Sequence, residues 1–226
     1  MRRLSFGAAL LAAPLILAAP SQAVDLKHKL TDLTEIEMPY GVTTIEDFDR
    51  NGRKGMVVVG YRPTGTAGSY NRFTFLIKSD DMAEPTVSAW DIVTTDTRNR
   101  SVGVVGVVDS VRDQPHTDED RVASVRLFKA RLDGEPATIL IEAWRDLAKA
   151  ESIPSPTPAT IEIYRLTKDV EGYSTFERVE VARSTELYGN IDFALCRELK
   201  VPIPRNETEA SLPLPAAKGE AGDCPP

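Results

Sequence analysis

Three oxygen-bearing side chains alternate along one short segment, at Asp47, Asp49 and Asn51, and Gly52 follows directly. A calcium ion takes roughly six to eight oxygen ligands, which alternate residues of a tight loop can supply where a glycine permits the sharp turn. The bidentate acid of an EF-hand is absent, because Val58 stands at that position. The alternative is a hairpin turn in which Asp and Asn bond their own backbone and Asn51-Gly52 takes positive φ. The spacing therefore predicts either a weak calcium site or a self-bonded turn.

The only two cysteines, Cys196 and Cys224, both lie near the C-terminal end. In an oxidising compartment an even pair predicts a disulfide. The chain-entropy model gives such a bridge about 3.5 kcal/mol of stabilisation. The alternative is one buried free cysteine in a helix and one exposed cysteine in a tail. We expect the bridge.

Other catalytic chemistry finds little support in the residue types. His116 lies in an acidic loop with Asp118 and Asp120, a set that could bind zinc or form a solvated surface loop. The second histidine, His28, lies between two lysines and is expected to be exposed. The chain has no Gly-x-Ser-x-Gly elbow, and 34 acids single out no particular carboxylate pair. The sequence therefore predicts no catalytic residue.

Aromatic side chains are a further source of binding contacts. Most lie within expected strands, where a place in the hydrophobic core is the simplest interpretation. Tyr70 and Tyr173 lie at loop edges instead. We expect these two rings to be exposed and available to a sugar or a peptide.

The first 23 residues have the pattern of a secretory signal peptide. Arg2 and Arg3 precede the apolar run Leu4–Ala19, and small residues lead to a predicted cleavage before Val24. The run is shorter than the ~20 residues needed to span a membrane, and no later run approaches that length. We therefore expect a periplasmic or secreted protein without a membrane span after cleavage. Removing residues 1–23 takes away two arginines and no acid, so the formal charge changes from −7 to −9, which disfavours nucleic-acid binding.

Hydrophobic periodicity predicts mostly strands to position these groups. The expected strands are 55–61, 73–78, 87–93, 102–111, 122–132, 137–144, 161–166 and 176–182. Asp133-Gly134 and Glu171-Gly172 are turn signals between them.

Two segments have helical spacing. Leucines at 26, 30 and 33 predict a short helix over Lys27–Leu33. Asn190 is a candidate cap for a second helix that ends before Pro202.

The predicted fold is mainly β, an antiparallel sandwich or incomplete propeller-like β lobes with one C-terminal helix. Residues 24–147 form a β lobe that carries the Asp-rich turn, and 148–158 are a Pro-rich linker or loop. Residues 159–204 supply a hairpin and the helix, and we expect them to share a domain with 24–147. The tail 205–226 is expected to be disordered except where Cys224 holds it. One or two domains remain open.

Two stretches, 47–62 and 130–145, share an acidic residue, a turn with Gly, an aliphatic core and an aromatic-Arg end. This order resembles FG-GAP/VCBS repeat units, whose blades begin with an Asp-rich turn and a buried strand. The resemblance implies that the turn binds calcium through Asp-x-Asp-x-Asp/Asn-Gly-x-x-Asp. Positions 47, 49, 51 and 52 match, whereas Gly55 replaces the last acid and the second copy keeps only Asp133-Gly134. A complete propeller needs four or more blades, and the chain has room for about two to three.

These observations favour an exported binding or accessory module whose partner is a protein or a glycan. One alternative is a hydrolase that acts on glycan or envelope substrates through paired carboxylates. Another is a structural or adhesive module stabilised by Ca²⁺.

Overall fold

The computed structural model describes residues 24–65, 68–79, 90–96, 106–114, 121–152, 155–203 and 224. The predicted signal peptide, the acidic loop with His116, Asp118 and Asp120, and the tail apart from Cys224 lie outside these residues. The elements are β1 (Leu30–Ile36), β2 (Gly41–Ile45), β3 (Gly55–Arg62), β4 (Tyr70–Lys78), β5 (Trp90–Asp96), β6 (Val107–Val108), β7 (Val111–Arg112), β8 (Ala123–Leu132), β9 (Glu135–Arg145), the 3-10 turn η1 (Leu147–Lys149), β10 (Thr157–Lys168), β11 (Ser174–Tyr188) and α1 (Ile191–Leu199).

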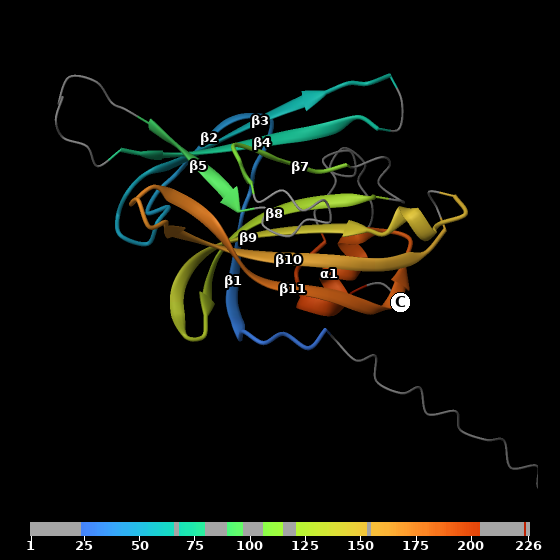
Figure 1. Ribbon diagram of the computed structural model, residues 1–226. Coiled ribbons are helices and arrows are strands. Elements are labelled where there is room, and N and C mark those ends of the chain that lie inside the picture. Colours follow the sequence, from blue (N-terminus) through green and yellow to red (C-terminus); the bar gives the residue numbers. More distant parts are fainter. Residues whose placement is uncertain are drawn as a thin grey trace, which may run out of the picture.

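The strands form one curled sheet in the order β1-β8-β9-β10-β11-β5-β4-β3-β2, with β6 beside β5 and β7 beside β4. Neighbours pair antiparallel, except that β11 and β5 run parallel and pair only at Thr175–Thr94 and Phe176–Thr95. The curl places β2–β5 over one side of β8–β11, while α1 packs on the other side (Figure 1). The predicted mainly β fold with one C-terminal helix is confirmed.

Two hydrophobic clusters fill the spaces on either side of the central strands. Along β9, Ile139 and Ile141 belong to the cluster under α1, and Leu140 belongs to the cluster between the two sheet halves. None of these three side chains is exposed to solvent. Because both faces of β9 are covered, its segment is continuously apolar rather than alternating, as fully buried strands are.

The tight turns follow the sequence signals. Asp133 and Gly134 have φ of 53° and 88°, the two positive values that a type I′ hairpin turn requires, and they join β8 to β9. Gly172, with φ of 90°, lies in the turn between β10 and β11. The Pro-rich segment 148–158 lies mostly between β9 and β10, which are direct neighbours in the sheet.

The prediction of a helix over Lys27–Leu33 is wrong. Residues from Leu30 to Ile36 form β1, which pairs with β8 and contains a bulge at Asp32, where φ is 54°. A two-turn helix is unstable by itself, whereas the open edge of β8 supplies hydrogen-bond partners for an extended chain. The leucines are partly buried against the cluster under α1. Their spacing therefore reflects which side chains are buried and not a helical conformation.

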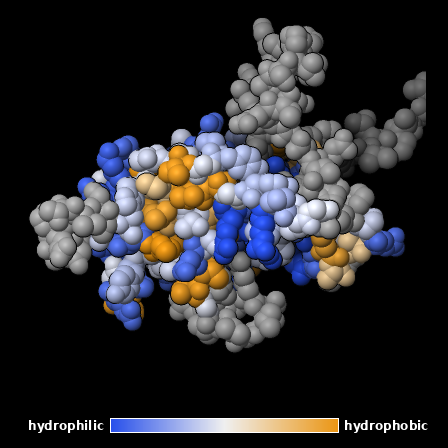
Figure 2. Space-filling model, turned by 90° about the horizontal axis from the view of Figure 1, so that it is seen from above, coloured by the Kyte–Doolittle hydropathy of each residue, from blue (hydrophilic) through white to orange (hydrophobic). Residues whose placement is uncertain are grey.

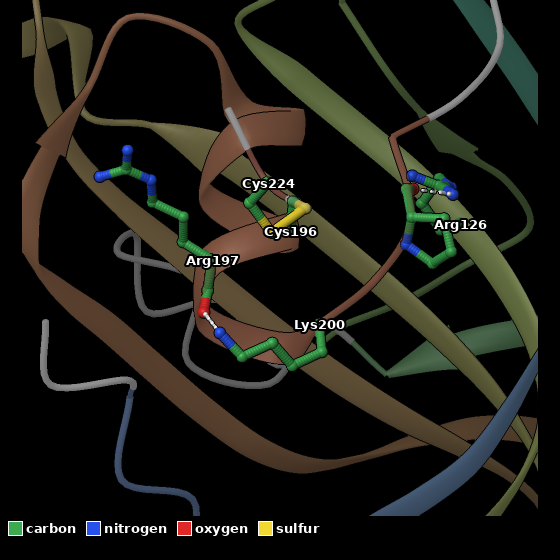
Figure 3. Close-up of a disulfide and its surroundings, with 6 residues drawn as sticks. Arg126, Cys196, Arg197, Lys200 and Cys224 are labelled. Atoms are coloured by element: carbon green, nitrogen blue, oxygen red, sulfur yellow. Dashed lines mark hydrogen bonds between the residues drawn. A yellow bond between two sulfur atoms is a disulfide. The ribbon is translucent and has the colours of Figure 1, made fainter. Parts of the chain in front are cut away.

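The C-terminal helix begins and ends with capping contacts. Asn190 Oδ1 accepts the backbone N–H of Asp192 at 2.8 Å, which confirms the predicted cap. Lys200, in the left-handed conformation, donates its N–H to Cys196 O and ends the helix before Pro202. Cys196 is bonded to Cys224, so the predicted disulfide is present on this helix (Figure 3). No described helix is long and apolar enough to cross a membrane.

Candidate functional site

A cavity of about 590 Å³ is bounded by β4 and β7 from one half of the sheet and by β8 and β9 from the other. We call it the β7 cavity. Its charged and aromatic lining residues are Tyr70, Arg72, Arg112, Asp113, Glu142, Trp144 and Arg145. Strand register brings them together, because β7 pairs with the start of β4 while Trp144 lies opposite Ala123 at the start of β8.

Two arginines lie directly opposite each other at this cavity. Arg72 on β4 is the register partner of Arg112 on β7. Arg72 Nε donates a hydrogen bond to Ser110 Oγ at 2.7 Å, and the Arg112 guanidinium lies 5.4 Å from the centroid of the Tyr70 ring. Within the described chain, neither arginine forms an ion pair with an acid. Like charges directly opposite on a strand pair are destabilising, so this end of the cavity favours an anion.

Tyr70 is held between two cationic groups. The guanidinium of Arg62 lies 6.0 Å from the Tyr70 ring centroid, and its Nη1 donates to Tyr70 Oη at 3.3 Å. With Arg112 on the same ring, Tyr70 is half-buried and not freely exposed as the sequence suggested. Tyr173, by contrast, is 63% exposed, as predicted.

Asp113 is a buried carboxylate in the wall of the β7 cavity. Its Oδ1 accepts the backbone N–H of Asn71 at 3.0 Å, and its Oδ2 accepts Asn71 Nδ2 at 3.1 Å. Burial raises the pKa of Asp113 by more than these hydrogen bonds lower it. Asp113 also lines a second cavity of about 230 Å³ on the side of Arg121 and Arg126.

Glu142 is the second acid of the cavity wall. It lies directly opposite Glu162 across the β9–β10 pair, and both are almost fully buried. Glu162 is compensated by Arg178 Nη1 at 2.9 Å and by the Tyr164 hydroxyl, which donates to it. The structure therefore gives each of these acids a different setting, with Glu142 on the cavity and Glu162 inside a closed network.

A buried ion network beside Asp113 ties three elements together. Arg126 on β8 donates two hydrogen bonds to Glu35 on β1. It donates a third to Pro202 O at 2.9 Å, the dashed line at Arg126 in Figure 3. Asp192 of α1 lies 3.2 Å from Arg121 Nε and 3.9 Å from Arg126 Nη1. Because its charges are matched within the fold, we assign this network to structure rather than to ligand binding.

The Asp-rich turn has the contacts of a self-bonded turn. Asp47 Oδ1 accepts the N–H of Gly52 at 2.8 Å, and Asp49 Oδ1 accepts the N–H groups of Asn51 and Arg53 at 3.0 and 3.1 Å. Positive φ occurs at Asp47, Arg50 and Gly52 rather than at Asn51. These donors engage Asp47 Oδ1 and Asp49 Oδ1, two of the side-chain oxygens that the calcium hypothesis assigned to a metal.

Arg53 completes the turn. Its Nε lies 2.6 Å from Asp49 Oδ2 in a largely buried ion pair. Burial raises the pKa of Asp49, but hydrogen bonds from Arg53 and from the backbone lower it further, so the pKa lies below its usual value. No group of three or more His, Cys, Asp or Glu in the described ranges is arranged to hold a metal ion. Asp49 could serve a cation only if Arg53 moved away, so these contacts favour the self-bonded turn over the calcium site.

The outer face of β2–β5 is a second notable surface. Apolar side chains gather on it, bordered by strongly hydrophilic ones (Figure 2). Val42, Val58 and Ile92 are 63%, 37% and 48% exposed. His28 lies elsewhere, with Nδ1 2.7 Å from Asp133, and takes no part in the β7 cavity.

The fold and the cavity define a class of protein: a curled β-sheet folded onto itself, backed by one helix, with a charged cavity between its halves. The crystal structure of CarG is similar, with a TM-score of 0.51 and 20% identity over 72% of this chain and 93% of that chain. At this identity the likeness shows the fold alone. No family model matches the sequence. No curated protein matches it either.

Proposed function

We propose that this protein is an exported binding module whose small ligand occupies the β7 cavity. The observation that carries the proposal is the cavity itself, because about 590 Å³ lies within the usual range of small-molecule sites. Its wall combines aromatic rings, which supply contact area, with a few charged groups, which supply orientation.

Export is supported by two features of the chain. Residues 1–23 have the composition of a signal peptide, and the two cysteines are joined in a disulfide. Disulfides persist in oxidising compartments outside the cytosol. A binding role rather than catalysis is supported by the described lining, in which the Ser110 hydroxyl is engaged by Arg72 and no histidine is present.

Intrinsic fluorescence tests the proposal directly, because the chain has two tryptophans and only Trp144 lines the cavity. In the Trp90→Phe variant, Trp144 is the sole reporter. We expect a saturable change in its emission with at least one member of a library of small metabolites and glycan fragments. Ser110→Phe, which fills the cavity, should abolish the change, and the exposed Thr185→Phe should not. A library without any saturable binder would refute the proposal.

A second candidate is a carboxylate-based hydrolase, favoured because Asp113 and Glu142 line one cavity and the pKa of Asp113 is raised. A carboxyl with a raised pKa suits a general acid beside an ionised partner. Turnover of a glycan substrate that is lost in both Asp113→Asn and Glu142→Gln would establish this candidate. Binding without turnover supports the module.

A further inference from the structure

The arginine pair of the β7 cavity is placed by backbone register. Residues directly opposite on antiparallel strands have Cβ atoms about 4.5–5.5 Å apart and project from the same face. Arg72 and Arg112 stand in this relationship, and both line the cavity. The two guanidinium groups therefore start from neighbouring points and extend over the same surface.

Both side chains are held by neighbours that do not neutralise them. The Ser110 hydroxyl fixes Arg72, and the Tyr70 ring supports Arg112. Arg62 adds a third positive charge, because its guanidinium also lies near the Tyr70 ring, 6.0 Å from the ring centroid. The chain has 34 acids against 27 lysines and arginines, yet no described acid is paired with either Arg72 or Arg112. A local excess of positive charge on an acidic protein indicates a site for an external anion.

The guanidinium group of arginine is best suited to carboxylate and phosphate anions. Arginine presents parallel N–H donors that bind the oxygens of a carboxylate or a phosphate in pairs. The rest of the wall limits how much charge the ligand can carry, because the two acids Asp113 and Glu142 outweigh the one further arginine, Arg145, and so disfavour a second anionic group. These acids accept hydrogen bonds from hydroxyl groups, and the face of Trp144 can stack on a sugar-like body.

We infer that the ligand is a small hydroxylated molecule with one carboxylate or phosphate group, which Arg72 and Arg112 bind together. This inference rests on the proposed binding function and specifies its ligand class. The hydroxylated part lies toward Asp113, Glu142 and Trp144. The acidic net charge disfavours a nucleic-acid chain.

Isothermal titration calorimetry on the chain that begins at Val24 tests the inference with three probes that share a glucose-type ring and differ in charge. Glucose 6-phosphate carries a phosphate at C6, glucuronate carries a carboxylate at C6, and glucose carries neither. At constant ionic strength we expect at least one of the two anions to bind at least tenfold more tightly than glucose. The stronger of them identifies the natural headgroup as phosphate or carboxylate.

Variants localise the anion. Arg72→Gln and Arg112→Gln should each weaken anion binding by about tenfold or more. Arg131→Gln removes the same charge from an exposed, distant position and should leave binding unchanged. Without ligand, the melting temperature of Arg72→Gln and Arg112→Gln should equal or exceed that of the wild type, because repulsion across the strand pair is relieved.

Two outcomes would overturn the inference. One is glucose binding as tightly as both anions, and the other is anion binding that survives both arginine substitutions. If neither anion binds while the Trp144 fluorescence screen finds an uncharged ligand, the inference fails and the binding module stands. If that screen finds nothing as well, the proposed function fails together with it.

Discussion

The backbone N–H of Val24 donates a hydrogen bond of 2.7 Å to Oε2 of Glu198, a buried residue on α1. The other carboxylate oxygen accepts the Tyr188 hydroxyl at 2.8 Å. Burial and the neighbouring Glu198 raise the pKa of Tyr188, which keeps its hydroxyl a donor. Val24 follows the predicted signal cleavage, which would turn this N–H into a charged α-ammonium group.

We predict that cleavage before Val24 strengthens this contact. A hydrogen bond between two charged groups contributes about 1.5–3 kcal/mol, so Glu198→Gln should lower the free energy of unfolding of the chain beginning at Val24 by about that amount. Urea denaturation measures the change. The control is Glu186→Gln, which removes a partly exposed acid 3.6 Å from Arg197. Equal stability of the two variants would contradict the prediction.

Asp113 should make stability depend on pH. For an acid whose pKa is raised in the folded state, folding favours the proton, so stability falls as pH rises from about 3.8 through the folded pKa. Asp113→Asn carries no such penalty. Its amide must place an NH2 against one of the two Asn71 donors, which costs a hydrogen bond at every pH, so we expect the stability of Asp113→Asn relative to the wild type to rise as the pH increases from 3 to 8.

Thermal melts from pH 3 to 8 on Asp113→Asn and on the exposed control Asp109→Asn test this dependence. A constant difference between Asp113→Asn and the wild type across that range would show that the carboxyl does not contribute through its titration.

Gly55 should be intolerant of any side chain. A Cβ at this position would lie 2.3 Å from the Phe48 ring, which is fully buried between the sheet halves. Gly55→Ala must displace that ring, and overpacking of this kind costs about 1–3 kcal/mol. Gly60→Ala, in the same strand but with open space around it, is the matched control and should be near neutral. Similar melting temperatures for both variants would show that Phe48 moves freely.

The Asp-rich turn should be stable without calcium. Because Asp49 already pairs with Arg53, we expect the melting temperature to be the same in calcium and in chelator. Asp49→Asn should destabilise the protein by about 1–3 kcal/mol, because it removes the charge that Arg53 needs. A calcium-dependent rise in the wild type that is lost in Asp49→Asn would instead support the metal-binding alternative and the repeat resemblance.

Local signals in the sequence were the reliable ones. Asn190 caps the helix that follows it, and Asp133-Gly134 forms the turn between its neighbouring strands. Both depend only on residues close in sequence, so the sequence alone predicts them. The leucines before Ile36 misled because burial against α1 produced a helical spacing in an edge strand. The arginine pair could not be predicted, since β7 is two residues long and Arg112 meets Arg72 only through strand register.

The short parallel contact between β11 and β5 has a consequence for temperature. Only two residue pairs join these strands, and the ring of Phe176 beside them packs with its centroid 5.2 Å from that of Phe75 and 6.2 Å from that of Phe48. Hydrophobic attraction weakens on cooling, whereas backbone ladders within each half are less affected. The contact between β11 and β5 should therefore loosen on cooling before the longer antiparallel pairings on either side of it do.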